Sequence, residues 1–349
     1  MRGARRQCGL AGIVVALGLL ASACAAAGGT GSANESEVTL RLGYFPNLTH
    51  ATGIVGVEKG LFSQSLGPGV RLQTSTFNAG PAAVEALFSQ AVDAVYIGPN
   101  PAINAFAKSD GTAIRIVAGA TSGGAFLVVR PGIDDASDLR GTRLSSPQLG
   151  NTQDVALRAW LAKQGLRTTL EGSGDVSIRP QENAQILEAF RAGGLDGAWV
   201  PEPWATRLVN EGGGHVLVDE ADLWPGGQYV TTHLVVRTGF LTEHPDAVKR
   251  LLQGHVASTD FITQHPEEAK RIVNDAIETL TGKRLADATL NEAWDHLRFT
   301  VDPIASSLRR SAGDATSLGL LDRVDLGGIY DLTLLNEVLS EAGQPEVSQ

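Results

Sequence analysis

The chain has 349 residues, 43% of them hydrophobic and 19% charged, which is the composition of a folded globular protein rather than of a disordered chain. Its 38 acidic residues outnumber its 28 basic residues, and the resulting net charge of −10 argues against a nucleic-acid partner, because binding phosphates requires a basic surface. The one strongly apolar stretch, residues 9–20, is shorter than the roughly 20 residues that a membrane-spanning helix needs, so we do not expect an integral membrane protein.

The N-terminal segment has the three parts of an export signal. Arginines near the N-terminus form a basic start, residues 9–20 form an apolar middle, and small residues lead up to Cys24. This pattern predicts a signal peptide over residues 1–23 and a mature chain that begins at Cys24, whose thiol carries a lipid anchor. Cleavage without lipid attachment, near Ala23 or Ala27, is the alternative, because the last leucine lies one position further from the cysteine than in the usual lipoprotein signal.

The segment that follows, residues 24–37, is rich in small and polar residues, which predicts a flexible tether between the anchor and the folded domain. Cys8 and Cys24 are the only cysteines of the chain. The mature domain is therefore expected to have no disulfide and no cysteine-based metal site.

From residue 38 onward, strand-like and helix-like patterns alternate. The first series of predicted strands covers residues 38–43, 70–77, 93–97 and 114–118, with helices around 54–61 and over 81–90 and 101–108. The second series has strands near 142–145, 176–178 and 196–200, with helices from 152 to a stop at Gly165 and over 182–192. This alternation predicts two α/β units, each with a mostly parallel sheet covered by helices on both faces.

Two nearly identical strand sequences indicate how the units are joined. Residues 126–132 read Phe-Leu-Val-Val-Arg-Pro-Gly, and residues 233–239 read His-Leu-Val-Val-Arg-Thr-Gly. We interpret them as two paired crossover strands that form a hinge, with the second unit inserted into the first; a chance likeness of two buried strands is the alternative. The expected division is residues 38–125 and 238–341 for the first lobe, 126–237 for the second lobe with its hinge strands, and 342–349 for a C-terminal tail.

Several predicted strands run into a turn of Gly, Pro or Asn and then into a helix, and in open parallel sheets ligands bind at that carboxyl edge. Such turns offer free backbone N–H groups beside hydroxyl or amide side chains, which suits a small anion; simple helix capping is the alternative for each turn taken alone. Candidate ligand-binding residues in these turns are Tyr44, Asn47, His50, Asn78, Gly80, Gly98, Asn100, Thr121, Ser122, Gln148, Asn151, Thr152, Glu202 and Trp204.

These turns contain no Lys or Arg, so we expect an anion to be held by helix dipoles and neutral donors. Glu202 has three possible roles: it faces solvent, stabilises a helix start, or meets a cationic group of a zwitterionic ligand. Trp204 either forms a wall of the pocket or packs in the core.

Catalytic signatures are scarce in this sequence. The seven histidines include no pair at metal-binding spacing, and no Gly-x-Ser-x-Gly elbow or phosphate-binding glycine loop occurs. His255 falls on the apolar side of a predicted helix, where we expect a core histidine with a hydrogen-bond partner. The sequence therefore predicts a protein that is not an enzyme and that needs no metal or cofactor.

The turn sequences together resemble those of the aliphatic sulfonate, nitrate and taurine group of ABC-transporter solute-binding proteins. The likeness covers nearly all of residues 38–341. The motifs that carry it are Gly43-Tyr44-Phe45-Pro46-Asn47-Leu48-Thr49-His50-Ala51, Phe77-Asn78-Ala79-Gly80-Pro81, Tyr96-Ile97-Gly98-Pro99-Asn100-Pro101, Pro147-Gln148-Leu149-Gly150-Asn151-Thr152, Val200-Pro201-Glu202-Pro203-Trp204 and Thr231-Thr232-His233.

The resemblance implies an α/β fold of the type II periplasmic-binding-protein class, with two lobes joined by two crossover strands, and a cleft lined by the quoted turns and by Thr231. It implies a monomeric lipoprotein at the outer face of the cytoplasmic membrane or in the periplasm, which delivers a small anion to the permease and ATPase of an ABC importer. Aliphatic sulfonate is the first expectation, and nitrate or taurine comes next. A binder of pyrimidine precursors, or a synthase-like protein of the same fold, is the remaining alternative.

Overall fold

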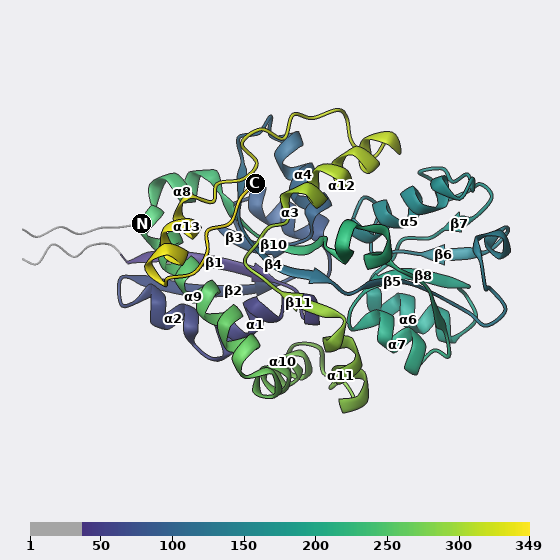
Figure 1. Ribbon diagram of the computed structural model, residues 1–349, viewed down its shortest axis with the longest axis horizontal. Coiled ribbons are helices and arrows are strands. Elements are labelled where there is room, and N and C mark those ends of the chain that lie inside the picture. The colour runs from purple at the N-terminus through teal and green to yellow at the C-terminus, as the bar shows by residue number, and fades with distance from the viewer. Residues whose placement is uncertain (1–36) are drawn as a thin grey trace, which may run out of the picture. The chain divides into compact units, whose positions relative to one another are not determined.

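The computed structural model describes residues 37–349, which form one compact unit built from two sheets and many helices (Figure 1). The predicted signal peptide, Cys24 and residues 24–36 of the predicted tether lie outside the described residues. Within residues 37–349, no helix is both long and apolar enough to cross a bilayer.

The first lobe is organised around a six-stranded sheet with the order β11-β4-β10-β3-β1-β2. Strands β1, β2 and β3 are parallel to one another, whereas β10 runs antiparallel between β3 and β4. The strands of this sheet are β1 (Val38–Tyr44), β2 (Val70–Thr76), β3 (Ala94–Ile97), β4 (Ile114–Gly123), β10 (Val230–Arg237) and β11 (Leu297–Phe299).

Helices lie on both faces of this sheet and enclose the larger hydrophobic core (Figure 1). Gly60 separates the first two helices at a positive φ of 70°, which favours glycine, and the predicted stop at this residue is confirmed. The helices of the first lobe are α1 (Ala51–Glu58), α2 (Leu61–Leu66), α3 (Gly80–Phe88), α4 (Pro99–Lys108), α8 (Thr238–Glu243), α9 (Pro245–Gln264), α10 (Pro266–Thr281), α11 (Asp287–Asp295), α12 (Ala305–Ser317) and α13 (Thr333–Glu341).

The second lobe has a five-stranded sheet with the order β7-β6-β8-β5-β9, in which β5 runs antiparallel to both neighbours. Two separate hydrophobic clusters pack against this sheet. One contains Leu127 and Trp199, and the other contains Phe126 and Val200. Its elements are β5 (Ala125–Val129), β6 (Arg143–Ser145), α5 (Thr152–Lys163), β7 (Ser177–Ile178), α6 (Asn183–Arg191), β8 (Gly197–Pro201), α7 (Trp204–Asn210) and β9 (His215–Asp219).

The two similar strands do not pair with each other, so that part of the interpretation is wrong. Residues 126–129 belong to β5 of the second sheet, and residues 233–237 belong to β10 of the first sheet. Each is the first strand after a crossing between lobes, and each is inserted antiparallel in the middle of its own sheet. A strand buried on both faces needs a continuous apolar run, so their similarity reflects equivalent positions.

The crossings themselves are short, and the second contains two 3-10 helices, Glu220–Leu223 and Pro225–Gly227. Gly124 alone separates β4 from β5, and residues 220–229 lead from β9 to β10. The strands of the second sheet thus lie within residues 125–219, and β10, residues 230–237, belongs to the first sheet.

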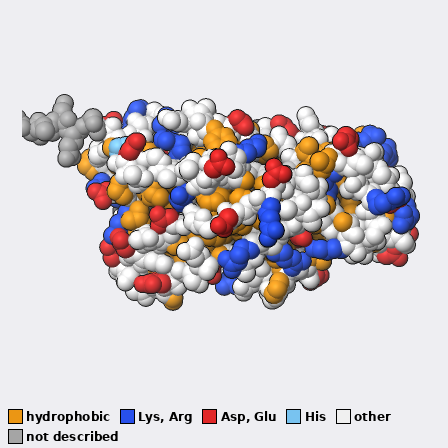
Figure 2. Space-filling model, turned by 90° about the horizontal axis from the view of Figure 1, so that it is seen from above, with side chains coloured by type: hydrophobic (Ala, Val, Ile, Leu, Met, Phe, Trp, Pro, Cys, Tyr) orange, Lys and Arg blue, Asp and Glu red, His pale blue; other side chains and the backbone are white. Residues whose placement is uncertain are grey.

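The surface carries charges of both signs. On the face shown in Figure 2, Lys and Arg side chains are interspersed with Asp and Glu side chains over both lobes. Several of the Lys and Arg side chains lie next to one another in the lower middle of this view.

Candidate binding site

A small cavity of about 30 Å3 lies between the two lobes, with room for about two water-sized groups. The first lobe contributes residues from the ends of β1 and β3, the start of α3 and from β10, and the second lobe contributes the starts of α5 and α6 and the end of β8. The lining residues are Phe45, Asn47, Thr49, His50, Asn78, Gly98, Pro147, Asn151, Thr152, Gln153, Asn183, Pro201, Thr231 and Thr232.

The cavity forms where several strands end and helices begin. The cavity is lined by Gly98, which immediately precedes α4, and by Asn151, which immediately precedes α5. It is also lined by Asn183, the first residue of α6. Asn151 makes no side-chain hydrogen bond that caps its helix. The first N–H groups of α5 therefore remain available, and the positive end of the helix dipole favours an anion at this place.

Three buried polar atoms that belong to lining residues have no hydrogen-bond partner in the described structure. They are Thr152 Oγ1, Asn183 Oδ1 and Thr232 Oγ1, and their residues are 6%, 7% and 1% exposed. An unsatisfied buried polar group costs about 1–3 kcal/mol, so such groups are rarely left without a partner unless a ligand or water supplies one. They come from both lobes, which indicates that a bound molecule would contact both.

His50 is a neutral hydrogen-bond donor at the first-lobe side of the cavity. Its ring stacks on Phe45 with 4.3 Å between ring centroids, and its Nδ1 accepts the Phe45 backbone N–H at 3.3 Å. Since Nδ1 acts as an acceptor, the ring proton sits on Nε2. Burial lowers the pKa of His50 to about 3, so the ring carries no charge near neutral pH.

The residues that line the cavity include no Lys, Arg, Asp or Glu. A nearby ion pair, Asp154 with Arg158, is buried within α5, and its carboxylate also accepts the Ser146 hydroxyl and the Gly150 backbone N–H. The pair holds the turn before α5 in shape while adding no net charge. The site thus offers dipoles and neutral donors to a ligand, as the turn sequences predict.

The structure brings together part of the predicted site. Seven of the predicted residues line the cavity: Asn47, His50, Asn78, Gly98, Asn151, Thr152 and Thr231. Gly80 lies beside it, because a Cβ on this glycine would be 3.3 Å from Asn151 Oδ1. These residues remain candidates for ligand contact.

Five other predicted residues do not line the cavity. Tyr44 is part of the first-lobe core, and Ser122 is buried in β4. Gln148 is not among the lining residues, and its buried side-chain oxygen has no hydrogen-bond partner in the described structure. The Thr121 hydroxyl donates to the Thr49 carbonyl at 2.7 Å and so supports a lining residue. Asn100 turns toward α12, where its Nδ2 donates to the Ser311 carbonyl at 3.4 Å.

Glu202 and Trp204 do not line this cavity either, although Trp204 lines a separate cavity of about 180 Å3 that both lobes also line. Both residues connect the lobes. The indole N–H of Trp204 donates to Asn47 Oδ1 at 2.9 Å. The Glu202 carboxylate is fully buried, accepts the backbone N–H and hydroxyl of Thr206, and lies 2.7 Å from His296 Nδ1. Of the three roles considered for Glu202, stabilising a helix start matches the bonds to Thr206.

The list of predicted residues omits several that line the cavity. Asn183 and Thr232 supply two of the three unpartnered atoms, and neither was singled out as a candidate. Asn183 begins α6 shortly after the end of β7, so the rule that placed the other turns at the carboxyl edge also points to it. The remaining omitted residues are Phe45, Thr49, Pro147, Gln153 and Pro201.

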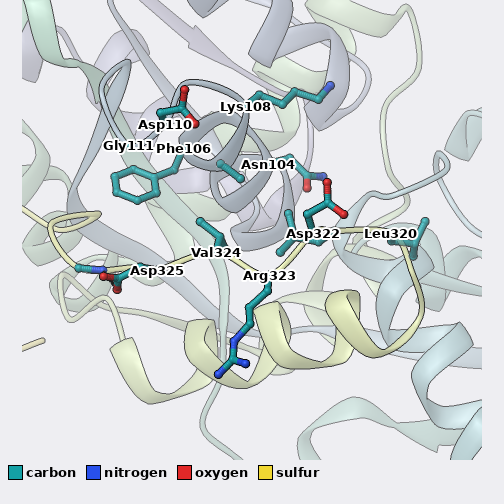
Figure 3. Close-up of a pocket in the computed structure, with 13 residues that line it drawn as sticks. Asn104, Phe106, Lys108, Asp110, Gly111, Leu320, Asp322, Arg323, Val324 and Asp325 are labelled. Carbon is teal, nitrogen blue, oxygen red and sulfur yellow. Dashed lines mark hydrogen bonds between the residues drawn. The ribbon is translucent and has the colours of Figure 1, made fainter.

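A larger cavity, of about 750 Å3, lies entirely within the first lobe, between the end of α4 and residues 320–327 (Figure 3). Its lining includes acidic and basic side chains. Figure 3 shows Lys108 and Arg323 extending in different directions, so their charges do not converge on one point. None of the unpartnered buried atoms of the described residues belongs to its lining. The smaller cavity between the lobes is therefore the better candidate site.

Comparison with known proteins identifies the family of this chain. The model of the NMT1-like family matches residues 33–277. The chain belongs to the NMT1-like family. This result agrees with the resemblance to sulfonate, nitrate and taurine binding proteins that the turn motifs predict.

Two relatives share sequence with the chain over part of their length. A binding protein of Brucella abortus (strain 2308) is 27% identical over 220 residues, which cover 62% of this chain and 64% of the relative. The taurine-binding periplasmic protein of Escherichia coli (strain K12) is 28% identical over 181 residues, which cover 52% of this chain and 54% of the relative. The matches thus span less than two thirds of these proteins.

A solved structure shares the fold. The alkanesulfonate-binding protein SsuA from Xanthomonas axonopodis pv. citri, bound to MOPS, superposes with a TM-score of 0.68 at 20% identity, covering 82% of this chain and 95% of that chain. The two-lobed α/β architecture is thus the type II periplasmic-binding-protein fold that the sequence predicts.

Proposed function

We propose that this chain is the solute-binding component of an ABC importer that captures a small oxyanion, with an aliphatic sulfonate as the first candidate. The observation that carries the proposal is the cavity between the lobes, where two buried hydroxyls that can donate, those of Thr152 at the start of α5 and of Thr232 on β10, have no partner in the described structure. A taurine-binding relative and an alkanesulfonate-binding structural neighbour support the choice of ligand class.

The proposed mechanism is capture by neutral donors followed by closure. Oxygen atoms of the ligand accept hydrogen bonds from the N–H groups at the start of α5, from the hydroxyls of Thr152 and Thr232, and from the Nε2–H of His50. Hydrogen bonds to a charged ligand are stronger in a site from which water is excluded. Because the donors belong to both lobes, the ligand stabilises the closed arrangement, and the permease distinguishes it from the open one.

Nitrate is the second candidate, and the volume of the cavity favours it. With room for about two water-sized groups, the cavity must widen for either ligand, and the carbon chain of taurine or of a longer sulfonate requires the lobes to lie further apart than nitrate does. We take the chain to be non-catalytic, because its lining has no Asp, Glu, Lys or Cys to act as acid, base or nucleophile, and burial lowers the pKa of its one histidine, His50, to about 3.

A thermal-shift and calorimetric comparison of ethanesulfonate, taurine, nitrate, bicarbonate and a pyrimidine tests the ligand class. A ligand at about 100 times its dissociation constant adds roughly 2.7 kcal/mol of stability, which raises the melting temperature by about 5–10 °C. We expect this rise with at least one sulfonate or nitrate and recovery of the ligand unchanged. Stabilisation by the pyrimidine alone, or turnover of any ligand, would contradict the proposal.

We also propose that Cys24 carries a lipid that anchors a monomer to the outer face of the cytoplasmic membrane. The support is the basic start, the apolar middle and the small residues before this cysteine. Cys24→Ala should move the protein from the membrane fraction to the soluble fraction and leave ligand affinity unchanged. A variant that still carries lipid and sediments with membranes would show that the anchor lies elsewhere.

A further inference from the structure

We propose that His296 and Glu202 form a latch between the lobes, through which closure takes up a proton. Neither side chain lines the ligand cavity. Glu202 follows β8 in the second lobe, and His296 stands between α11 and β11 in the first lobe. Their Oε1 and Nδ1 atoms are 2.7 Å apart.

The latch sits at the first crossing between the lobes. A Cβ on Gly123 would lie 2.8 Å from the His296 carbonyl oxygen, and a Cβ on Gly124 would lie 3.5 Å from the Glu202 side chain. The His296 ring also packs against Phe126 of β5, with 4.7 Å between ring centroids. Figure 1 shows α11 and α7, the helices next to these residues, lying beside each other. Any opening of the lobes about this crossing therefore moves His296 relative to Glu202.

Burial distinguishes this pair from the other charged contacts between the lobes. In the pairs of Lys163 with Asp314 and of Lys283 with Glu211, every side chain is at least 23% exposed. Such pairs contribute little to stability, because water already solvates both charges. The Glu202 side chain is 0% exposed, and His296 is 35% exposed. A buried carboxylate that loses its cationic partner is costly, whereas in an open protein water replaces that partner.

The charges around His296 all favour its protonated form. Besides Glu202, the groups that act on it are the carboxylates Asp219 at the end of β9 and Glu292 on α11, and Phe126 is neutral. The hydrogen bond to Glu202 is the largest cause that raises the pKa of His296 above its ordinary value in the closed structure. Opening removes this contact and returns the pKa toward about 6.5.

The direction of the pH effect follows from this difference. Below the open-state pKa, His296 is protonated in both arrangements, and the latch is fully present. As the pH rises through the raised pKa of the closed structure, His296 loses its proton and the closed arrangement loses its advantage. Between the two pKa values, one proton is taken up on closing, so the ratio of closed to open protein falls by up to about tenfold per pH unit.

Solution scattering of the ligand-free protein at about pH 5.5 and pH 8.5 tests the latch independently of the proposed function, because no ligand is present. We expect a smaller radius of gyration at the lower pH, and the same radius at both pH values in His296→Gln. Glu202→Gln removes the pair from the other side and should also abolish the change. An unchanged radius in the parent protein, or a change that persists in both variants, would overturn the proposal.

Two further variants serve as controls. His215→Gln alters a histidine whose carboxylate neighbour, Asp134 at 4.0 Å, belongs to the same lobe, so the pH-dependent change should persist. Glu220→Gln alters a second buried carboxyl at the other crossing, and burial raises the pKa of Glu220 to about 7, into the same pH range. The change should persist in this variant as well. If the pH-dependent change in radius is lost in Glu220→Gln and retained in His296→Gln, the titrating group lies at the other crossing, and the latch is contradicted.

Discussion

The cavity between the lobes and the larger cavity of the first lobe differ in the property that marks a binding site. The larger one has about 750 Å3 and several charged side chains, but its lining contains none of the unpartnered buried atoms found in the described residues. The one between the lobes has about 30 Å3 and three such atoms. Unmet hydrogen bonds that converge from two lobes therefore indicate a ligand better than volume does.

The largest expected effect comes from preventing the lobes from meeting. A Cβ on Gly98 would lie 2.4 Å from Thr152 Oγ1, which belongs to the opposite lobe, while the backbone of Gly98, at φ −71°, accepts alanine. Gly98→Ala should therefore abolish closure and lower the affinity for the best ligand of the screen by more than about a hundredfold. Calorimetric titration measures this change.

Gly313→Ala provides the matched control, since this glycine lies on α12 beside another first-lobe cavity and has no atom within 4 Å of an added Cβ. It should leave the affinity unchanged. If Gly98→Ala also binds like the parent protein, the site does not lie between the lobes.

A smaller effect is expected from removing one unpartnered hydroxyl: the protein should bind its ligand more weakly, yet be more stable without ligand. Thr152→Val deletes a donor to a charged ligand, which should weaken binding by about 1.5–3 kcal/mol, or roughly ten- to a hundredfold. The same change removes a buried polar atom without a partner, so the ligand-free protein should melt at a higher temperature. Calorimetry and thermal denaturation without ligand give the two numbers.

Asn104→Ala, in the lining of the larger cavity, is the control for Thr152→Val and should change neither affinity nor the response to ligand. Weaker binding in Asn104→Ala together with parent-like binding in Thr152→Val would reverse the comparison of the two cavities.

The third effect is on stability in acid and not on binding. Burial lowers the pKa of His50 to about 3 and the pKa values of His233 and His255 to about 4, so these rings stay neutral in the folded protein while the unfolded chain binds protons below about pH 6.5. The free energy of unfolding should therefore fall as the pH drops from 6.5 toward 4, by about 1.4 kcal/mol per pH unit for each ring.

Urea denaturation of the parent protein and of His255→Gln between pH 6.5 and 4.5 checks the sign and the size of this effect. The variant should show a shallower loss of stability with acid. An equal slope in both proteins would mean that His255 takes up its proton in the folded state, although its Nδ1 lies 2.8 Å from the Tyr96 hydroxyl in the core.

Local sequence signals predicted most of the fold. The stop at Gly60, the alternation of strands and helices and the burial of His255 with a hydrogen-bond partner all depend on residues close in sequence or on one face of a helix, and they are confirmed. The pairing predicted for residues 126–129 and 233–237 is wrong, because an apolar run indicates burial and does not indicate which sheet the strand joins.

Roles that depend on distant partners could not be predicted. Asn100, Glu202 and Trp204 occupy turns of the expected kind, but their side chains bond Ser311, His296 and Asn47, which are 211, 94 and 157 residues away in the sequence. A turn motif places a residue at the edge of the sheet and leaves open whether it faces the cavity or the opposite lobe. Only the packing of the two lobes decides between these outcomes.

A crystal structure of the protein with ethanesulfonate, or with whichever anion of the screen binds best, tests the central claim most directly. The account predicts the anion between the lobes, with its oxygen atoms within hydrogen-bond distance of Thr152, Thr232 and the backbone N–H groups at the start of α5. Electron density for the anion in the cavity between α4 and residues 320–327, with the space between the lobes filled by water alone, would contradict it.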